Sequence, residues 1–225
     1  MSSIDAGGGA PRAAGAARKP QQARSQETLE RFVEATAALL AERSFDEITV
    51  TDIVRRAHRT VGSFYARFDD KYGVLLELVD RTYARITHVV RAFCDPVRWE
   101  GQSLAEFMAE SIRLNVQAYR RSARLFRAAL IAATSDERFR TRRLEVMGFC
   151  AEQQKRFVLT RCDEVTAPDP ARASDQAFEL IVATLDEALL FGRFTSTSPA
   201  SDLALVADLT EQCLNVLGAV PRTGG

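Results

Sequence analysis

The sequence lacks the cysteine and histidine patterns of several protein classes. Its 225 residues contain two histidines and four widely spaced cysteines, with no C-x-x-C pair. This composition gives no zinc-binding pattern and no disulfide framework, and it fits a reducing cytoplasm. Basic and acidic residues balance at 30 each. Any affinity for nucleic acid must therefore come from a local patch and not from the charge of the whole molecule.

Catalytic motifs and targeting signals are also missing. The chain has no H-E-x-x-H, Walker A, G-x-S-x-G or Rossmann motif. Residues 1–24 are rich in Ala, Gly and Pro and lack the apolar stretch of a secretory signal. We therefore predict a cytoplasmic protein without membrane segments, cofactors or metal ions, and not an enzyme. An all-helical enzyme is the weaker alternative, because it would need a paired acid and base in a cleft.

The most informative stretch, residues 49–68, predicts two short helices joined by a tight turn. Thr49 precedes an apolar run and is followed three residues later by Asp52, as in a capping box. Thr60 is a suitable N-cap for the second helix, and Asp70 is one for the long helix that follows. Apolar residues recur at helical spacings on both sides of the turn, so that one small core can serve both helices. These residues are Ile53, Ala57, Phe64 and Phe68.

The same stretch has a basic and partly exposed character. Four arginines and no acid lie from Arg55 to Arg67, which is the footprint expected of phosphate contact, although a solvated basic face has the same composition. Gly62 costs about 1 kcal/mol in a helix relative to alanine, so its presence indicates the close approach of another backbone. Neighbouring Ser63 and Tyr65 are placed to reach base edges and phosphate oxygens.

One long motif resembles the TetR family of bacterial transcriptional regulators. It reads Ala57-x-x-Thr60-x-Gly62-Ser63-Phe64-Tyr65-x-x-Phe68-x-Asp70-Lys71, preceded by Thr49-x-x-x-Ile53-Val54. The resemblance covers about residues 25–75, and it implies a helix-turn-helix with a recognition helix at about 60–66. The candidate DNA-contact residues are Thr49, Thr51, Arg59, Thr60, Val61, Gly62, Ser63, Tyr65, Arg67 and Lys71.

The chain departs from the family pattern in the turn and after it. The family usually has glycine and then an apolar residue where this chain has His58 and Arg59. Histidine tolerates a positive φ better than most residues, so we expect the turn to survive. We expect Arg59 to swing out to DNA or to snorkel. Tyr72 and Gly73 also differ from the acidic and helix-favouring residues usual at the next helix start.

Helical periodicity continues to the end of the chain, so the predicted fold class is all-α. A three-helix head would be joined by a long helix to a C-terminal ligand-binding and dimerisation domain. We predict a disordered basic arm over 1–24, which is either a flexible tail or a DNA-contacting arm, then the DNA-binding head over 25–72, and the helical effector-binding and dimerisation domain over 73–220. The predicted helices cover 25–43, 70–94, 103–120, 122–134, 137–163, 174–195 and 200–218, with loops at 167–170 and 195–199.

The helix predicted over 174–195 is apolar on more than one stripe. Such a helix is buried on two sides, one of which can face a second copy of the chain. One short recognition helix reads only a few base pairs, so we predict a homodimer on a palindromic double-stranded DNA operator. The predicted interface residues are Phe178, Ile181, Val182, Leu185, Leu189, Leu203, Val206 and Leu214.

Aromatic residues of the middle helices suit a cavity for a small apolar ligand, although core packing explains each of them singly. The candidate pocket residues are His88, Phe93, Trp99, Phe107, Met108, Ser111, Asn115, Phe126 and Phe149. The resemblance implies a repressor that a small, mainly apolar effector releases from its operator by shifting the helix over 70–94. The alternative is a DNA-binding activator or an effector-independent DNA binder.

Overall fold

The computed structural model of the protein describes residues 18–191 and 199–219. Within these two ranges the chain is helical and forms no strand, which confirms the predicted fold class. The helices are α1 (Arg18–Glu42), α2 (Val50–Arg56), α3 (Val61–Tyr65), α4 (Lys71–Phe93), α5 (Leu104–Arg121), α6 (Ala123–Ala133), α7 (Glu137–Leu159), α8 (Pro170–Leu190) and α10 (Pro199–Leu217). The 3-10 turns are η1 (Phe45–Glu47), η2 (Pro96–Trp99) and η3 (Cys162–Glu164).

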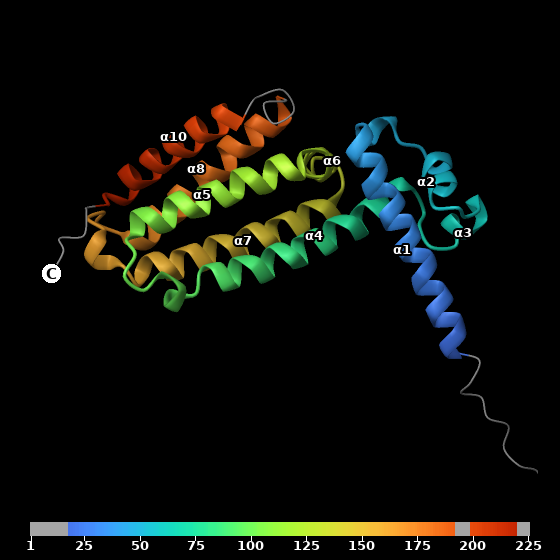
Figure 1. Cartoon of the computed structure of the whole chain (residues 1–225), viewed down its shortest axis with the longest axis horizontal. Coiled ribbons are helices and arrows are strands. Elements are labelled where there is room, and N and C mark those ends of the chain that lie inside the picture. The colour runs from blue at the N-terminus through green and yellow to red at the C-terminus, as the bar shows by residue number, and fades with distance from the viewer. Residues whose placement is uncertain (1–17, 192–198, 220–225) are drawn as a thin grey trace, which may run out of the picture.

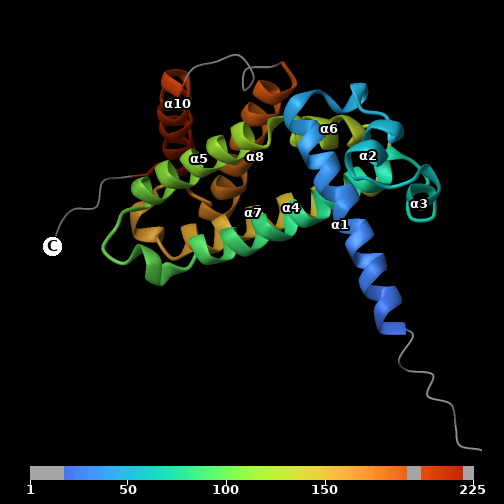
Figure 2. The ribbon, with the colours of Figure 1, turned by 45° about the vertical axis from the view of Figure 1, so that its right-hand side comes forward.

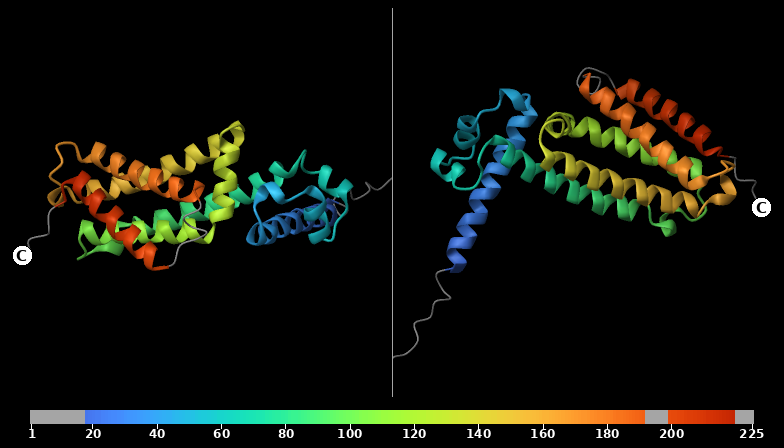
Figure 3. Two further views of the ribbon diagram at one scale, coloured as in Figure 1. Left: turned by 90° about the horizontal axis from the view of Figure 1, so that it is seen from above. Right: turned by 180° about the vertical axis from the view of Figure 1, so that it is seen from behind.

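The helices divide into a head and a body. The head, at one end of the molecule, consists of α1, α2, α3 and the first turns of α4 (Figure 1). The body consists of the remainder of α4 with α5, α7, α8 and α10, and α6 lies across its head-facing end (Figure 3). None of the helices in the described ranges has the combination of length and apolar character needed to cross a bilayer.

Helix α1 begins earlier than the sequence indicated. It starts at Arg18, so part of the arm predicted as disordered over 1–24 is helical, while residues 1–17 lie outside the described residues. Pro20 falls in the first turn, where a missing N–H is tolerated. Ser25, the predicted start, therefore lies inside the helix. Its hydroxyl accepts a hydrogen bond of 2.8 Å from Arg67 Nη2.

The predicted caps of the next three helices are confirmed. Thr49 and Asp52 form a reciprocal capping box at α2, with Asp52 N donating to Thr49 Oγ1 at 3.1 Å. The Thr60 side chain accepts from Ser63 N at α3, and the Asp70 side chain accepts from Gly73 N at α4. These caps satisfy backbone N–H groups that a helix start leaves unpaired.

The head core is built on aromatic contacts and extends into the body. Phe32 of α1 packs edge to face on Phe64, with ring centroids 5.3 Å apart. The same buried cluster includes Leu75 and Val79 of α4, together with Ala132 of α6 and Phe139 of α7. The boundary predicted after residue 72 therefore falls within a continuous hydrophobic core, and the division into domains at that point stays a prediction.

An ion-pair clamp reinforces the junction between α1 and α4. Arg81 contacts Glu30 of α1 and also Glu77 of its own helix, the latter at 2.8 Å. Its guanidinium side chain lowers the pKa of Glu30 by hydrogen bonding. The clamp holds α1 against α4 immediately before α4 enters the body.

The body core is centred on stacked aromatic rings between α5 and α7. Phe107 and Phe157 are stacked with centroids 3.8 Å apart, and Phe93 and Trp99 pack around them. Trp99 Nε1 donates to Phe93 O at 2.7 Å, which satisfies the one polar atom of the indole ring.

Helix α8 begins at Pro170, four residues before its predicted start at 174. Asp169 caps it by accepting from Arg172 N, and Pro170 occupies the first helical turn. The predicted loop over 167–170 is thus shorter than expected. Most of the other predicted loop, 195–199, lies outside the described residues.

The dimer interface predicted on α8 is wrong for its central residues. Ile181, Leu185 and Leu189 are each 3% exposed or less and belong to the core of their own chain. Both apolar stripes of α8 are occupied within one chain, because α10 and α5 cover one side and α7 lies on another (Figure 1). Of the remaining predicted residues, Phe178 and Val182 line an internal cavity, Val206 and Leu214 pack partly against the core, and Leu203 is exposed.

We expect Phe107→Ala to lower the free energy of unfolding by about 3–5 kcal/mol, because it removes a fully buried ring and leaves a void against Phe157. Leu144→Ala on α7 is the control, since Leu144 is 65% exposed and its truncation should change stability by less than about 0.5 kcal/mol. Urea denaturation followed by circular dichroism measures both. Equal stabilities for the two variants would contradict the described core.

Candidate nucleic-acid interface and candidate effector cavity

Helix α3 lies at the outer end of the head, away from the body (Figures 1 and 2). Phe64 is fully buried and anchors this five-residue helix to the head core, while Tyr65 is 55% exposed. Val61, Thr60 and Gly62 are also exposed. One buried side chain thus holds a short helix whose remaining surface faces solvent.

The environment of Gly62 bears on its predicted role. A Cβ atom added at Gly62 would meet nothing within 4 Å in the described chain. Packing inside the protein therefore does not require glycine at this position. The remaining reason is an approach from outside the chain, and the prediction that Gly62 faces DNA depends on it.

The turn between α2 and α3 survives the loss of its usual glycine. His58 adopts a φ of 52°, as predicted, and Arg59 N closes the turn by donating to Val54 O at 3.0 Å. Arg59 then folds back along the head, where its Nη2 donates to Glu27 Oε1 at 3.0 Å. We expected Arg59 either to swing out to DNA or to snorkel along the protein, and its side chain runs along the protein surface.

The arginines of this region have acidic partners that the local sequence did not reveal. Arg55 pairs with Asp52 at 2.5 Å, and Arg56 pairs with Glu42 of α1 at 2.6 Å. The carboxylates come from α1 and from the start of α2, outside the stretch that lacks acids. Exposed pairs of this kind contribute little stability, so a phosphate can replace the carboxylate at low cost.

Asp52 is held in its ionised form by the capping box. Hydrogen bonds from the Thr49 side chain and backbone, with a smaller contribution from Arg43 at 3.0 Å, lower the pKa of Asp52 to about 2. The cap is therefore intact at neutral pH. Thr49 and Thr51 are both exposed at the start of α2.

Lys71 has an internal role that the sequence did not indicate. Its ammonium donates to the carbonyl oxygens of Phe45 and Ile48 at 3.0 Å and of Asp46 at 3.3 Å. It also lies 4.7 Å from the centroid of the Phe45 ring. Three acceptors match the three donors of an ammonium group, so no donor is left for the predicted phosphate contact.

A cavity of about 540 Å³ lies within the body, between α4, α5, α7 and α8. Four of the predicted pocket residues line it, namely Phe93, Ser111, Asn115 and Phe126. The predictions for Trp99, Phe107 and Met108 are wrong, since all three are buried in the aromatic core. His88 is exposed on α4, and Phe149 lies outside the cavity with Arg91 5.3 Å from its ring centroid.

A buried polar network on the cavity wall was missed by sequence reasoning. Tyr119 Oη donates to Asp186 Oδ1 at 3.0 Å, and Arg143 Nη2 contacts Asp186 Oδ2. Burial raises the pKa of Tyr119, and it raises that of Asp186 against the opposing effect of Arg143. The three residues come from α5, α7 and α8, so only the fold brings them together.

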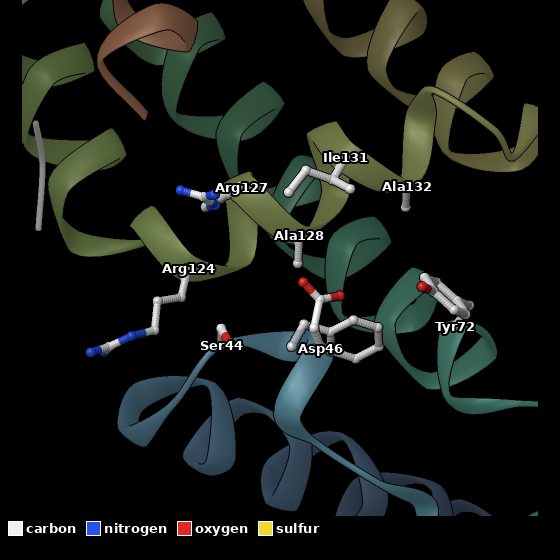
Figure 4. A pocket seen from close by; sticks show the side chains of 9 residues that line it. Ser44, Asp46, Tyr72, Arg124, Arg127, Ala128, Ile131 and Ala132 are labelled. Atoms are coloured by element: carbon white, nitrogen blue, oxygen red, sulfur yellow. The ribbon is translucent and has the colours of Figure 1, made fainter. Parts of the chain in front are cut away.

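A second cavity lies at the junction of η1, α4 and α6 (Figure 4). Its volume of about 40 Å³ suits a few water molecules and not an effector. Arg124 and Arg127 project away from Asp46, and they donate to the carbonyl oxygens of Ala41 and Leu190 at 2.7 and 2.9 Å. In the described part of the chain, no three His, Cys, Asp or Glu residues are grouped to hold a metal ion.

Comparison with known proteins agrees with this geometry. The family model for bacterial regulatory proteins of the tetR family matches residues 32–78. The uncharacterized HTH-type transcriptional regulator YwcC of Bacillus subtilis (strain 168) is 37% identical over 60 residues, which are 27% of each chain. The match to this curated relative thus spans about a quarter of its length.

Solved structures resemble nearly the whole chain. A proposed TetR-family regulator from Mesorhizobium loti MAFF303099 aligns with a TM-score of 0.67 and 18% identity, covering 86% of this chain and 98% of that one. RolR, solved in complex with resorcinol, aligns with a TM-score of 0.53 and 17% identity, covering 90% of this chain and 100% of that one. At such identities the likeness concerns the fold alone.

The exposed second helix of a capped helix-turn-helix, on a head joined to an all-helical body, defines a DNA-binding protein. The match over residues 32–78 shows that the head is a DNA-binding domain of the type found in the TetR family of bacterial transcriptional regulators.

We expect Tyr65→Ala to weaken operator binding by about 1–3 kcal/mol, a factor of roughly 5 to 150, while the head stays folded. The neighbouring Phe64→Ala is the contrasting variant, because it removes a buried ring and should destabilise the head itself by about 3–5 kcal/mol. Mobility shift and circular dichroism separate the two effects. Unchanged operator binding by a folded Tyr65→Ala variant would show that α3 does not read DNA.

We expect Lys71→Gln to lower head stability by about 1.5–3 kcal/mol through the loss of charged hydrogen bonds. The salt dependence of operator binding should stay unchanged, because the ammonium already serves three carbonyls. Arg67→Ala is the comparison, because the Arg67 side chain donates to a neutral hydroxyl, that of Ser25. This variant should reduce the salt slope by about one unit. If Lys71→Gln reduced the salt dependence of operator binding, the prediction that Lys71 contacts a phosphate would be correct after all.

Proposed function

We propose that the protein is a cytoplasmic repressor that binds a palindromic operator as a homodimer and is released by a small effector. The observation that carries this proposal is the exposed surface of α3. Val61 and Tyr65 flank an unobstructed Gly62, and buried Phe64 fixes their orientation. The candidate contacts to bases are Val61, Gly62, Ser63 and Tyr65.

Phosphate contacts are assigned to side chains that surround α3. Arg67 reaches Ser25, and Arg59 reaches Glu27, so both guanidiniums lie between α1 and α3. Their partners are a neutral hydroxyl and an exposed carboxylate, which a phosphate can replace. Thr49 and Thr51 at the start of α2 and Thr60 at the start of α3 add exposed hydroxyls beside helix N-termini.

Dimerisation is assigned to the outward faces of α8 and α10. Glu179, Ala183 and Glu187 lie at helical spacing on the exposed side of α8, and Ala204 and Ala207 are exposed on α10. Small side chains allow close approach of helices. Leu203 and Phe191 are exposed apolar residues on these two helices and supply anchors for a four-helix contact between two copies.

Effector release is assigned to the cavity and to α4. Helix α4 contributes Thr82, Ile86, Val90 and Phe93 to the cavity wall, and Arg81, directly before them, clamps the head. A ligand that fits the cavity better in one position of α4 shifts the population toward that position. RolR, a protein of the same fold, has been solved with resorcinol, which supports a small-molecule effector.

An activator or an effector-independent DNA binder is the second candidate function. The cavity favours the ligand-responsive repressor over an effector-independent protein, because its volume of about 540 Å³ lies in the range of small-molecule sites. Repressor and activator share the same head, and transcription in the presence of the operator distinguishes them.

Selection of bound DNA from a random library tests the proposal directly. We expect a palindrome whose half-sites are separated by about one helical turn or a multiple of it, since two heads related by a two-fold axis read it. The Tyr65→Ala variant serves as a control and should enrich the same sequence less strongly. Recovery of a single asymmetric half-site from the unaltered protein would contradict the dimeric reading.

A further inference from the structure

The cavity has two chemically different ends, and this difference bears on the effector class. The inference rests on the proposed effector site. Helices α4 and α7 run away from the head, while α5 and α8 return toward it (Figure 1). Lining residues early in α4 and α7 and late in α5 and α8 therefore lie near the head. Those at the opposite ends of these helices lie in the distal half.

Among the described residues, the distal half of the cavity carries no charged side chain, and its polar lining residues are Ser111 and Gln154. Its lining includes Phe93, Leu114 and Phe178, together with the thiols of Cys94 and Cys150. Burial raises the pKa of Cys94 to about 12 and that of Cys150 to about 11, so both thiols are neutral. This half suits a hydrocarbon chain or an aromatic ring.

All charged lining residues lie in the half near the head. They are Arg85, Arg121, Arg143 and Asp186, which gives three positive charges against one negative, a net charge of +2. Arg143 and Asp186 neutralise each other. Among the residues that the structure describes, no carboxylate lies within 4.0 Å of Arg85 or Arg121, and Arg85 contacts only the hydroxyl of Thr82 at 3.3 Å.

An excess positive charge at one end of a half-enclosed cavity selects the sign of its ligand. Two arginines without a carboxylate partner in the described chain attract an anion and repel a cation, and at exposed side chains this effect is modest. Arg85 and Arg121 are exposed at the rim, so they keep their hydration until a ligand arrives. Arg143 is held by Asp186 through its Nη2, so the unpaired positive charges of the described lining are those of Arg85 and Arg121.

We propose that the effector is an amphipathic organic anion of drug-like size, bound with its apolar part in the distal half and its anionic group beside Arg85 and Arg121. This orientation puts the charged group next to Thr82 and Arg85, within about one helical turn of the Arg81 to Glu30 clamp. The anionic group thus binds where α4 leaves the head. A neutral apolar effector would leave both rim arginines without a counter-charge.

Calorimetric titration with three matched probes tests the effector class. The probes are decanoate, 1-decanol and decylammonium, each added below its micelle concentration to the full-length protein at neutral pH. We expect decanoate to bind about tenfold more tightly than decanol, and decylammonium to bind most weakly. Tightest binding by decanol or by decylammonium would overturn the inference, and so would the absence of decanoate binding.

Substitutions at the rim locate the anionic group. We expect Arg85→Gln and Arg121→Gln each to weaken decanoate binding about two- to fivefold and to leave decanol binding unchanged. Arg91→Gln is the matched control, since Arg91 lies on α4 against Phe149 and outside the cavity. Equal effects of the three substitutions, or none at the rim, would contradict the assigned position.

A cavity-filling variant separates this site from the rest of the surface. Ala118 lines the cavity, and Ala118→Trp should abolish decanoate binding while the circular dichroism spectrum stays as in the unaltered protein. Decanoate binding retained by a folded Ala118→Trp variant would overturn the site. Operator binding measured before any probe is added tests the proposed function separately. If that binding were absent, the proposed function would fail, whatever the effector class.

Discussion

The structure depends on one helix that belongs to two cores. Leu75 and Val79 of α4 are buried in the head cluster, and Phe93 of the same helix is buried in the body cluster. Between them, Arg81 fastens α4 to Glu30 of α1. Because the same helix is packed in both clusters, we propose that a displacement of α4 at the cavity is passed to the head. This shared helix would join a cavity in the body to a helix at the far end of the molecule.

The recognition helix relies on the rest of the head for its order. Five residues are too few to form a stable helix in water. Phe64 is the one large side chain of α3 that is buried in the core. Thr60 caps the start of the helix, and His58 adopts the left-handed conformation in the turn before it. Val61 and Tyr65 of α3 are exposed and are therefore available to contact DNA.

Local features of the fold could be predicted from sequence, whereas pairings across helices could not. Thr49, Thr60 and Asp70 were identified as caps because capping is decided within three or four residues. The sequence of α8 does not distinguish an apolar stripe that packs on other helices of the same chain from one that packs on a second copy. Ile181 and Leu185 were therefore wrongly assigned to the interface with a second copy. Tyr119, Arg143 and Asp186 were missed because 67 and 43 residues separate Asp186 from its two partners. The same limit hid the carbonyl ligands of Lys71, which lie 23 to 26 residues before it.

Coupling between the cavity and the head is the central claim, and it is reciprocal by thermodynamic necessity. Its most direct test is the affinity of one cavity ligand for the free protein and for the protein saturated with operator DNA. We predict that the ligand binds more weakly to the DNA complex than to the free protein. The factor should equal the one by which the ligand weakens operator binding. Equal ligand affinities in the two states would contradict it, because the cavity and the head would then be independent.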